Sequence, residues 1–127
     1  MKIAVIIARV LLGFIFVFFG ANGLHPFLPM GPMPTGLAGQ FIAVFMQSHW
    51  VLVIATVQVI GGALLLVGRY VPLALALLGP VIVNILTFHL LMNLAGIGPG
   101  VLVTILWLFL FYRYRANFAG LFVAKAE

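Results

Sequence analysis

Three polar side chains interrupt long apolar runs of this sequence at positions where they could form a binding site. Gln58 lies in the run from residue 50 to 67, and Asn84 and His89 lie in the run from residue 72 to 93. An amide or imidazole group in apolar surroundings costs free energy unless it finds a hydrogen-bond partner. We therefore expect these side chains to face neighbouring helices or a ligand.

Two further candidate ligand-binding residues, Arg9 and Asn22, lie in the first apolar run, from residue 3 to 24. The rise of a helix places Arg9 only about 10 Å in from Ile3, so that its long side chain can extend back to the end of the run. Alternatively, its guanidinium binds a carbonyl or phosphate group of a ligand. Asn22 lies further along the run, on another helix face.

The composition places these residues in a membrane protein. The chain has 127 residues, of which 66% are hydrophobic and 6% are charged, too few charges for the surface of a soluble domain. We expect one domain in contact with the lipid bilayer. The six basic residues form no aromatic and basic surface, so nucleic-acid binding is not expected.

Four apolar stretches approach the length of about 20 residues that a bilayer core requires. Backbone groups must be satisfied within lipid, so we expect helices. The predicted fold is therefore an all-α membrane protein, a four-transmembrane-helix bundle. The spans are 3–24, 50–67, 72–93 and 100–118.

Turn residues separate these spans. Gly68 can end one helix in a left-handed conformation, and Pro72 can open the next. The stretch FIAVFMQSHW, residues 41–50, is short and partly amphipathic, which predicts an interfacial or re-entrant helix between the first two spans. Arg9 interrupts the first run and no A-x-A site follows it, so we do not expect a cleaved signal peptide.

The basic residues predict the orientation. With four spans, all six fall on one side of the membrane, and the other two loops carry none. The excess of Lys and Arg in cytoplasmic loops then predicts that both termini are cytoplasmic in a bacterial-type plasma (inner) membrane.

This topology places all three histidines, His25, His49 and His89, in the outer half, together with Met30, Met33, Met46 and Met92. His and Met together suit copper, and two histidines could ligate a haem, but no pattern specifies either site. His25 and His49 are more simply interfacial residues that bind water. The histidines are thus weak metal candidates, and no intrinsic cofactor is predicted.

Helical periodicity suggests that the polar groups of residues 72–93 face two directions. Asn84 and Thr87 share a face with Pro80, whereas His89 lies at least 140° round the helix on a separate face. Gln58 shares a face with Ala55, which allows close helix approach. One expected role of Gln58 is a hydrogen bond to Asn84 or Thr87 that joins the two helices.

Several chemistries are excluded by missing residue types. The chain has no Cys, and Glu127 is the only acidic residue. Disulfides, thiolate chemistry and proton exchange at a membrane-embedded carboxylate are therefore ruled out. No Ser/His/Asp set and no Gly-rich phosphate loop is present.

The residues also resemble the DoxX family of small four-helix membrane proteins. The resemblance covers most of the chain and is strongest in two segments, GGALLLVGRYVP (residues 61–72) and PVIVNILTFH (residues 80–89). It implies a connection to membrane redox chemistry involving quinones. Members often carry Glu at the position of Gln58, so the amide in this chain argues against an acid–base role there.

Two functions follow as hypotheses. In the first, the chain is an accessory membrane subunit of a quinone-linked oxidoreductase, and Gln58, Asn84 and His89 bind a quinone-type headgroup. A membrane or cytoplasmic partner subunit would carry the redox cofactor. In the second, the chain is a non-enzymatic assembly factor or a carrier of a small apolar ligand. Catalytic activity and a homo-oligomeric state are left open.

Overall fold

The computed structural model of the chain describes residues 1–29 and 31–126, and this part of the chain contains helices and no strand. Five α-helices and two 3-10 helices follow one another in the order α1 (Lys2–Leu24), α2 (Gly36–Gln47), α3 (Trp50–Val67), α4 (Val71–Met92), η1 (Leu94–Gly96), α5 (Gly98–Arg113) and η2 (Arg115–Phe122). Met30, one member of the methionines placed in the outer half, and Glu127 lie outside the described residues.

Helices α1, α3 and α4 are long and apolar enough to cross a membrane, and they coincide with the first three predicted spans to within one residue. Large apolar side chains are exposed along them, including Val53 at 64%, Val83 at 62% and Leu91 at 72%. No polar or charged residue of the described part is fully buried. Apolar side chains facing outward suit lipid and not water, so the helices indicate a multi-pass membrane protein.

The fourth predicted span, residues 100–118, is not one continuous helix. Helix α5 ends at Arg113, and η2 turns away from it by 81°, so the pair makes a fourth span only if a bent span is counted. The Arg115 guanidinium donates a hydrogen bond to the Tyr112 carbonyl at 2.7 Å, which supplies a partner at the helix end. Phe118 then folds back into the core against Phe111, with ring centroids 4.9 Å apart.

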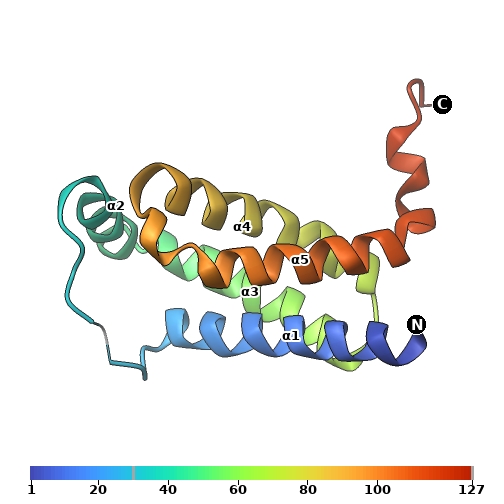
Figure 1. Cartoon of the computed structure of the whole chain (residues 1–127), viewed down its shortest axis with the longest axis horizontal. Helices are drawn as coiled ribbons and strands as arrows, with labels where there is room; N and C mark the ends of the chain where they lie inside the picture. Colours follow the sequence, from blue (N-terminus) through green and yellow to red (C-terminus); the bar gives the residue numbers. More distant parts are fainter. Residues whose placement is uncertain (30, 127) are drawn as a thin grey trace.

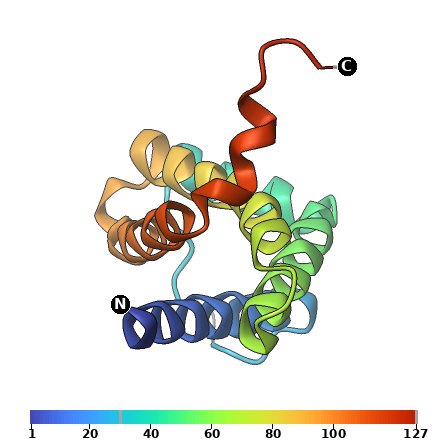
Figure 2. The same ribbon diagram turned by 90° about the vertical axis from the view of Figure 1, so that its right-hand side faces the viewer.

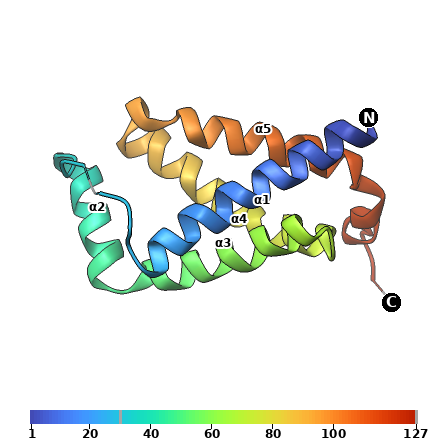
Figure 3. The ribbon, with the colours of Figure 1, turned by 90° about the horizontal axis from the view of Figure 1, so that it is seen from below.

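The four longer helices contact one another in a ring. Helix α1 packs against α3 and α5, and α4 packs against the same two helices, as the end-on view shows (Figure 2). Helix α2 runs across one end of these helices, and the N-terminus and the C-terminal segment lie at the other end (Figures 1 and 3).

The short helix α2 begins earlier than the sequence pattern predicts. It spans Gly36–Gln47, whereas the amphipathic stretch suggested residues 41–50. Gly36 has a positive φ of 72°, so the chain leaves the proline-containing connection there and enters the helix. The turn between α3 and α4 agrees with the prediction: Gly68 is left-handed and Pro72 lies in the first turn of α4.

Helices α1 and α3 approach so closely that two glycines touch across the contact. A Cβ atom placed on Gly62 would lie 2.7 Å from the carbonyl oxygen of Gly13, and one on Gly13 would lie 2.8 Å from the carbonyl oxygen of Gly62. Only a residue without a side chain fits at either position, since small residues let helix backbones meet in apolar surroundings.

The packed core occupies the part of the molecule that extends from its middle to the termini. Its largest fully buried side chains are five leucines, Leu12, Leu65, Leu75, Leu78 and Leu110. The half beside α2 contributes few fully buried residues and contains the cavities described next.

Candidate functional site

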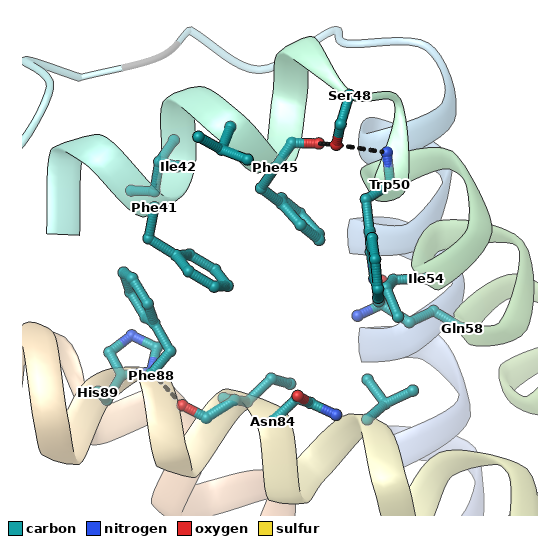
Figure 4. A pocket seen from close by; sticks show the side chains of 13 residues that line it. Phe41, Ile42, Phe45, Ser48, Trp50, Ile54, Gln58, Asn84, Phe88 and His89 are labelled. Carbon is teal, nitrogen blue, oxygen red and sulfur yellow. Dashed lines mark hydrogen bonds between the residues drawn. The ribbon is translucent and has the colours of Figure 1, made fainter. Parts of the chain in front are cut away.

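A cavity of about 570 Å³ lies between α2, α3 and α4 and is partly open to the outside (Figure 4). Most of its lining is apolar, and four polar side chains are included. The lining residues are Phe41, Ile42, Val44, Phe45, Ser48, Trp50, Ile54, Gln58, Val81, Asn84, Ile85, Phe88 and His89. An apolar hollow of this size with a few polar groups is typical of a site for a small ligand.

A second cavity of about 290 Å³ lies among α1, α3, α4 and the start of α5. Gln58, Ile85 and His89 line both cavities, so these three residues form the boundary between them. The remaining lining is almost entirely apolar, with Phe16 and Phe19 from α1 and Pro99 and Gly100 from α5 among its members.

Gln58 points its amide to this boundary without an internal partner. Its neighbours on the same side of α3, Ala55 and Gly62, are buried against α1, whereas Gln58 itself is half-buried. Its side chain makes no hydrogen bond within the described residues, yet no buried side-chain nitrogen or oxygen there lacks a partner. The amide must therefore have accessible surface, and its donor and acceptor are free to bind a ligand.

The predicted hydrogen bond from Gln58 to Asn84 or Thr87 is not formed. Asn84 Nδ2 donates to the Pro80 carbonyl at 2.9 Å, and Thr87 Oγ1 donates to the Val83 carbonyl at 2.7 Å. Both side chains are satisfied by a carbonyl of their own helix four residues earlier, which competes with partners on other helices. Asn84 retains its amide oxygen as an acceptor beside the cavity (Figure 4).

His89 is fixed by one of its ring nitrogens. Nδ1 lies 2.7 Å from the Ile85 carbonyl oxygen, and the Phe88 ring packs edge-on to the imidazole at 5.1 Å (Figure 4). The other nitrogen, Nε2, lies on the side of Gly96, where a Cβ atom would come within 3.5 Å of it. The histidine is half-buried at the boundary of the two cavities.

Asn84 and His89 lie on different sides of α4, as the helical periodicity predicts, yet one cavity reaches both. The residues of α4 that line it include Ile85 and Phe88, which lie at the centre of a broad face. Asn84 and His89 lie at the two edges of that face, about 140° apart. Thr87 lies beyond the edge and does not line the cavity.

The other two candidate binding residues, Arg9 and Asn22, form hydrogen bonds with backbone groups near helix ends. The Arg9 guanidinium donates to the carbonyl of Leu65 and, at 3.3 Å, to that of Leu66, in the last turn of α3. The Asn22 side-chain oxygen accepts from the backbone N–H groups of Phe27 and Leu28 at 2.9 Å each. Neither Arg9 nor Asn22 lines either cavity.

The histidines do not converge. His25 ends α1 and His49 precedes α3, and both are exposed. Across residues 1–29 and 31–126, no three side chains of His, Cys, Asp or Glu come together as a metal site would require. His25 and His49 therefore contribute nothing to the site around His89.

Aromatic side chains form part of the lining of the larger cavity, and the sequence analysis did not identify them as site residues. Phe41 stacks on Phe45 with centroids 5.9 Å apart, and it meets Phe88 of α4 at 5.3 Å (Figure 4). Trp50, at the start of α3, lines the same cavity. The spacing of Phe41 and Phe45, four residues apart, was the available signal, since such residues share a helix face.

Scans of the chain against protein-family models, curated proteins and solved structures give no match.

Proposed function

We propose that the chain is a four-helix membrane protein that binds the headgroup of a small apolar ligand of the quinone type. In this proposal α1, α3, α4 and the bent pair of α5 and η2 cross the membrane as a bundle, and α2 lies at the interface. The resemblance to the DoxX family supports both the bundle and the link to quinones.

The observation that carries the proposal is the meeting of aromatic rings and unpaired polar groups in one apolar cavity. Phe41, Phe88 and Trp50 offer flat apolar surfaces, and Gln58 offers a free amide beside them. A quinone needs both features, because its ring is flat and its carbonyl oxygens accept hydrogen bonds. The volume of about 570 Å³ is within the range of small-ligand sites.

The orientation belongs to the same proposal. Basic residues stand near the ends of helices that gather at one end of the molecule, with Lys2 beginning α1, Arg69 in the turn after α3 and Arg113 ending α5. An excess of basic residues marks the cytoplasmic side. We therefore place both termini in the cytoplasm and the cavity near the outer face of a bacterial-type inner membrane.

The proposed role is that of an accessory subunit. The chain offers hydrogen bonds, stacking surfaces and an apolar volume, which bind and orient a ligand. Electron transfer would use a cofactor of a partner oxidoreductase subunit. A ligand that binds without any effect on quinone-dependent respiration would instead indicate a carrier.

Fluorescence of Trp50 provides the direct test. The chain has two tryptophans, Trp50 in the cavity and Trp107 in α5, so a Trp107→Phe background isolates the signal of the cavity. A short-chain benzoquinone added to this protein in lipid nanodiscs should quench the fluorescence saturably. Quenching that rises linearly with the quinone concentration, as it would from quinone dissolved in lipid, would contradict the proposal.

A Gln58→Leu substitution should lower the affinity measured from the saturable quenching about fivefold, since a net hydrogen bond contributes about 1 kcal/mol. Thr56→Val is the matched control on the same helix. Thr56 is exposed, donates to the Leu52 carbonyl at 2.7 Å and does not line either cavity. If the two variants bind the quinone with equal affinity, Gln58 does not contribute to ligand binding.

A further inference from the structure

The tautomer of His89 carries information about the ligand that neither the sequence nor the cavity shape gives. A backbone carbonyl oxygen can only accept a hydrogen bond, so Nδ1, at 2.7 Å from the Ile85 carbonyl, must carry a proton. In the neutral imidazole the second nitrogen, Nε2, then has a lone pair and no proton. His89 therefore presents an acceptor to any ligand that reaches it.

This acceptor is both unpaired and accessible. No hydrogen bond to Nε2 is formed within the described residues, although the Asn93 amide nitrogen and Nε2 would both lie within 3.5 Å of a Cβ atom on Gly96. His89 is half-buried, and no buried side-chain nitrogen in the described chain lacks a partner. Nε2 must therefore have accessible surface, and the residue that carries it lines both cavities.

No group of the described residues donates to Nε2, so the donor is left to the ligand. No carboxylate or lysine lines either cavity, and the second cavity adds only apolar side chains and Gly96 near the imidazole. A quinone carbonyl placed against Nε2 would bring two acceptors together and lose its own hydrogen bond. The hydroxyl group of a quinol, in contrast, can donate to Nε2 directly.

We propose that the site binds the reduced, hydroquinone form of its ligand in preference to the quinone, through a hydrogen bond from a ring hydroxyl to His89 Nε2. This inference rests on the proposed function. Gln58 binds either form, because its amide has both a donor and an acceptor. His89 is the residue that distinguishes the two forms.

The expected preference is about tenfold. One hydrogen bond gained by the quinol is worth a few-fold in affinity, and the unpaired groups left by the quinone add to the difference. Because the bound couple transfers two electrons, a tenfold preference corresponds to a midpoint potential about 30 mV higher than that of the free couple. Binding alone would thus favour the reduced ligand.

The test compares three ligands that share one ring and differ at its two oxygen atoms, under anaerobic conditions. A short-chain quinone, its quinol and the dimethyl ether of that quinol are each equilibrated with protein-containing and empty nanodiscs, and the bound amounts are measured after extraction. We expect the quinol to bind about tenfold more tightly than the quinone. The ether lacks the hydroxyl donor, so it should bind no better than the quinone.

Variants then assign the preference to one residue. His89→Phe keeps a flat ring but has no acceptor, so the quinol should lose its advantage over the quinone. His25→Phe is the control, because His25 is exposed and lies outside both cavities. If His89→Phe does not fold, the comparison of quinol with ether on the unchanged protein still decides the question.

The failures can be told apart. If none of the three ligands binds beyond the empty nanodiscs, the proposed function itself is wrong. If the quinone binds as well as the quinol, or the ether as well as the quinol, only the preference for the reduced form is overturned. A preference that survives in His89→Phe also overturns it.

Discussion

Arg9 shows how a charged side chain within an apolar helix is used structurally. Its guanidinium donates to the carbonyls of Leu65 and Leu66 in the last turn of α3, and it lies against Gly68, where any side chain would collide with it. The last carbonyls of a helix have no partner within the helix and carry partial negative charge. Arg9 therefore ties α1 to the end of α3 through hydrogen bonds and charge.

Replacing Arg9 by Met should lower the free energy of unfolding by about 1–2 kcal/mol, because charged hydrogen bonds to two carbonyls are lost. The measurement is reversible unfolding in mixed micelles, followed by helical circular dichroism. Arg115→Met is the control. Arg115 also donates to a carbonyl, that of Tyr112, but it is exposed, so its removal should cost clearly less. Equal losses would contradict the role given to Arg9.

At the residue scale, polarity within apolar runs was a useful but incomplete guide to the site. It selected Gln58, Asn84 and His89, which the structure brings to one cavity. It also selected Arg9 and Asn22, which instead bond backbone groups. Residue type identifies a side chain that needs a partner, but only the tertiary structure decides whether backbone or cavity supplies it.

Helices α1 and α3 approach closely at Gly13 and Gly62, and this contact predicts a sensitive position. Gly62→Ala would place a Cβ atom 2.7 Å from the Gly13 carbonyl oxygen and 2.9 Å from the backbone nitrogen of Val17. Backbone atoms cannot move aside as a flexible side chain can. We expect a loss of about 1–3 kcal/mol from overpacking, although alanine favours helices over glycine by about 1 kcal/mol.

The control for this prediction is Gly98→Ala, at the start of α5. A Cβ atom there would meet nothing within 4 Å, so the higher helix propensity of alanine should leave the stability unchanged or raise it. Thermal unfolding of the two variants in the same detergent compares them directly. A Gly62→Ala protein as stable as Gly98→Ala would mean that α1 and α3 do not meet closely at this point.

At the element scale, the bounds of helices that follow continuous apolar runs were predictable from the sequence. Bounds that depend on tertiary contacts were not. The bounds of α1, α3 and α4 follow from local composition and from turn residues such as Gly68 and Pro72. The predicted fourth span extends to residue 118, yet α5 stops at Arg113. Phe118 is drawn back into the core against Phe111, a contact that no local pattern reveals.

The molecule as a whole is packed at one end and hollow at the other. The fully buried leucines lie from the middle toward the termini, whereas both cavities lie toward α2. Hydrophobicity alone could not show this difference, because α1, α3 and α4 are each apolar enough along their length to cross a membrane. The division matches a scaffold with a binding site at one membrane face.

The proposed orientation can be tested with single cysteines, because the chain has none of its own. Thr35→Cys places a thiol at the start of α2, and Ala116→Cys places one in η2; both positions are exposed and lie at opposite ends of the molecule. In intact bacterial spheroplasts, a membrane-impermeant maleimide should label Thr35→Cys. Ala116→Cys should react only after the membrane is permeabilised, since the basic end is expected to be cytoplasmic.

The unsubstituted chain is the control for this labelling, because any signal from it must come from other proteins. The reverse pattern, with Ala116→Cys labelled in intact spheroplasts and Thr35→Cys protected, would invert the orientation and move the cavity to the cytoplasmic face. Labelling of both thiols in intact cells would mean that the two ends do not lie on opposite sides of the membrane. The bent pair of α5 and η2 would then not act as a span, because three crossings place the C-terminal segment on the side of α2.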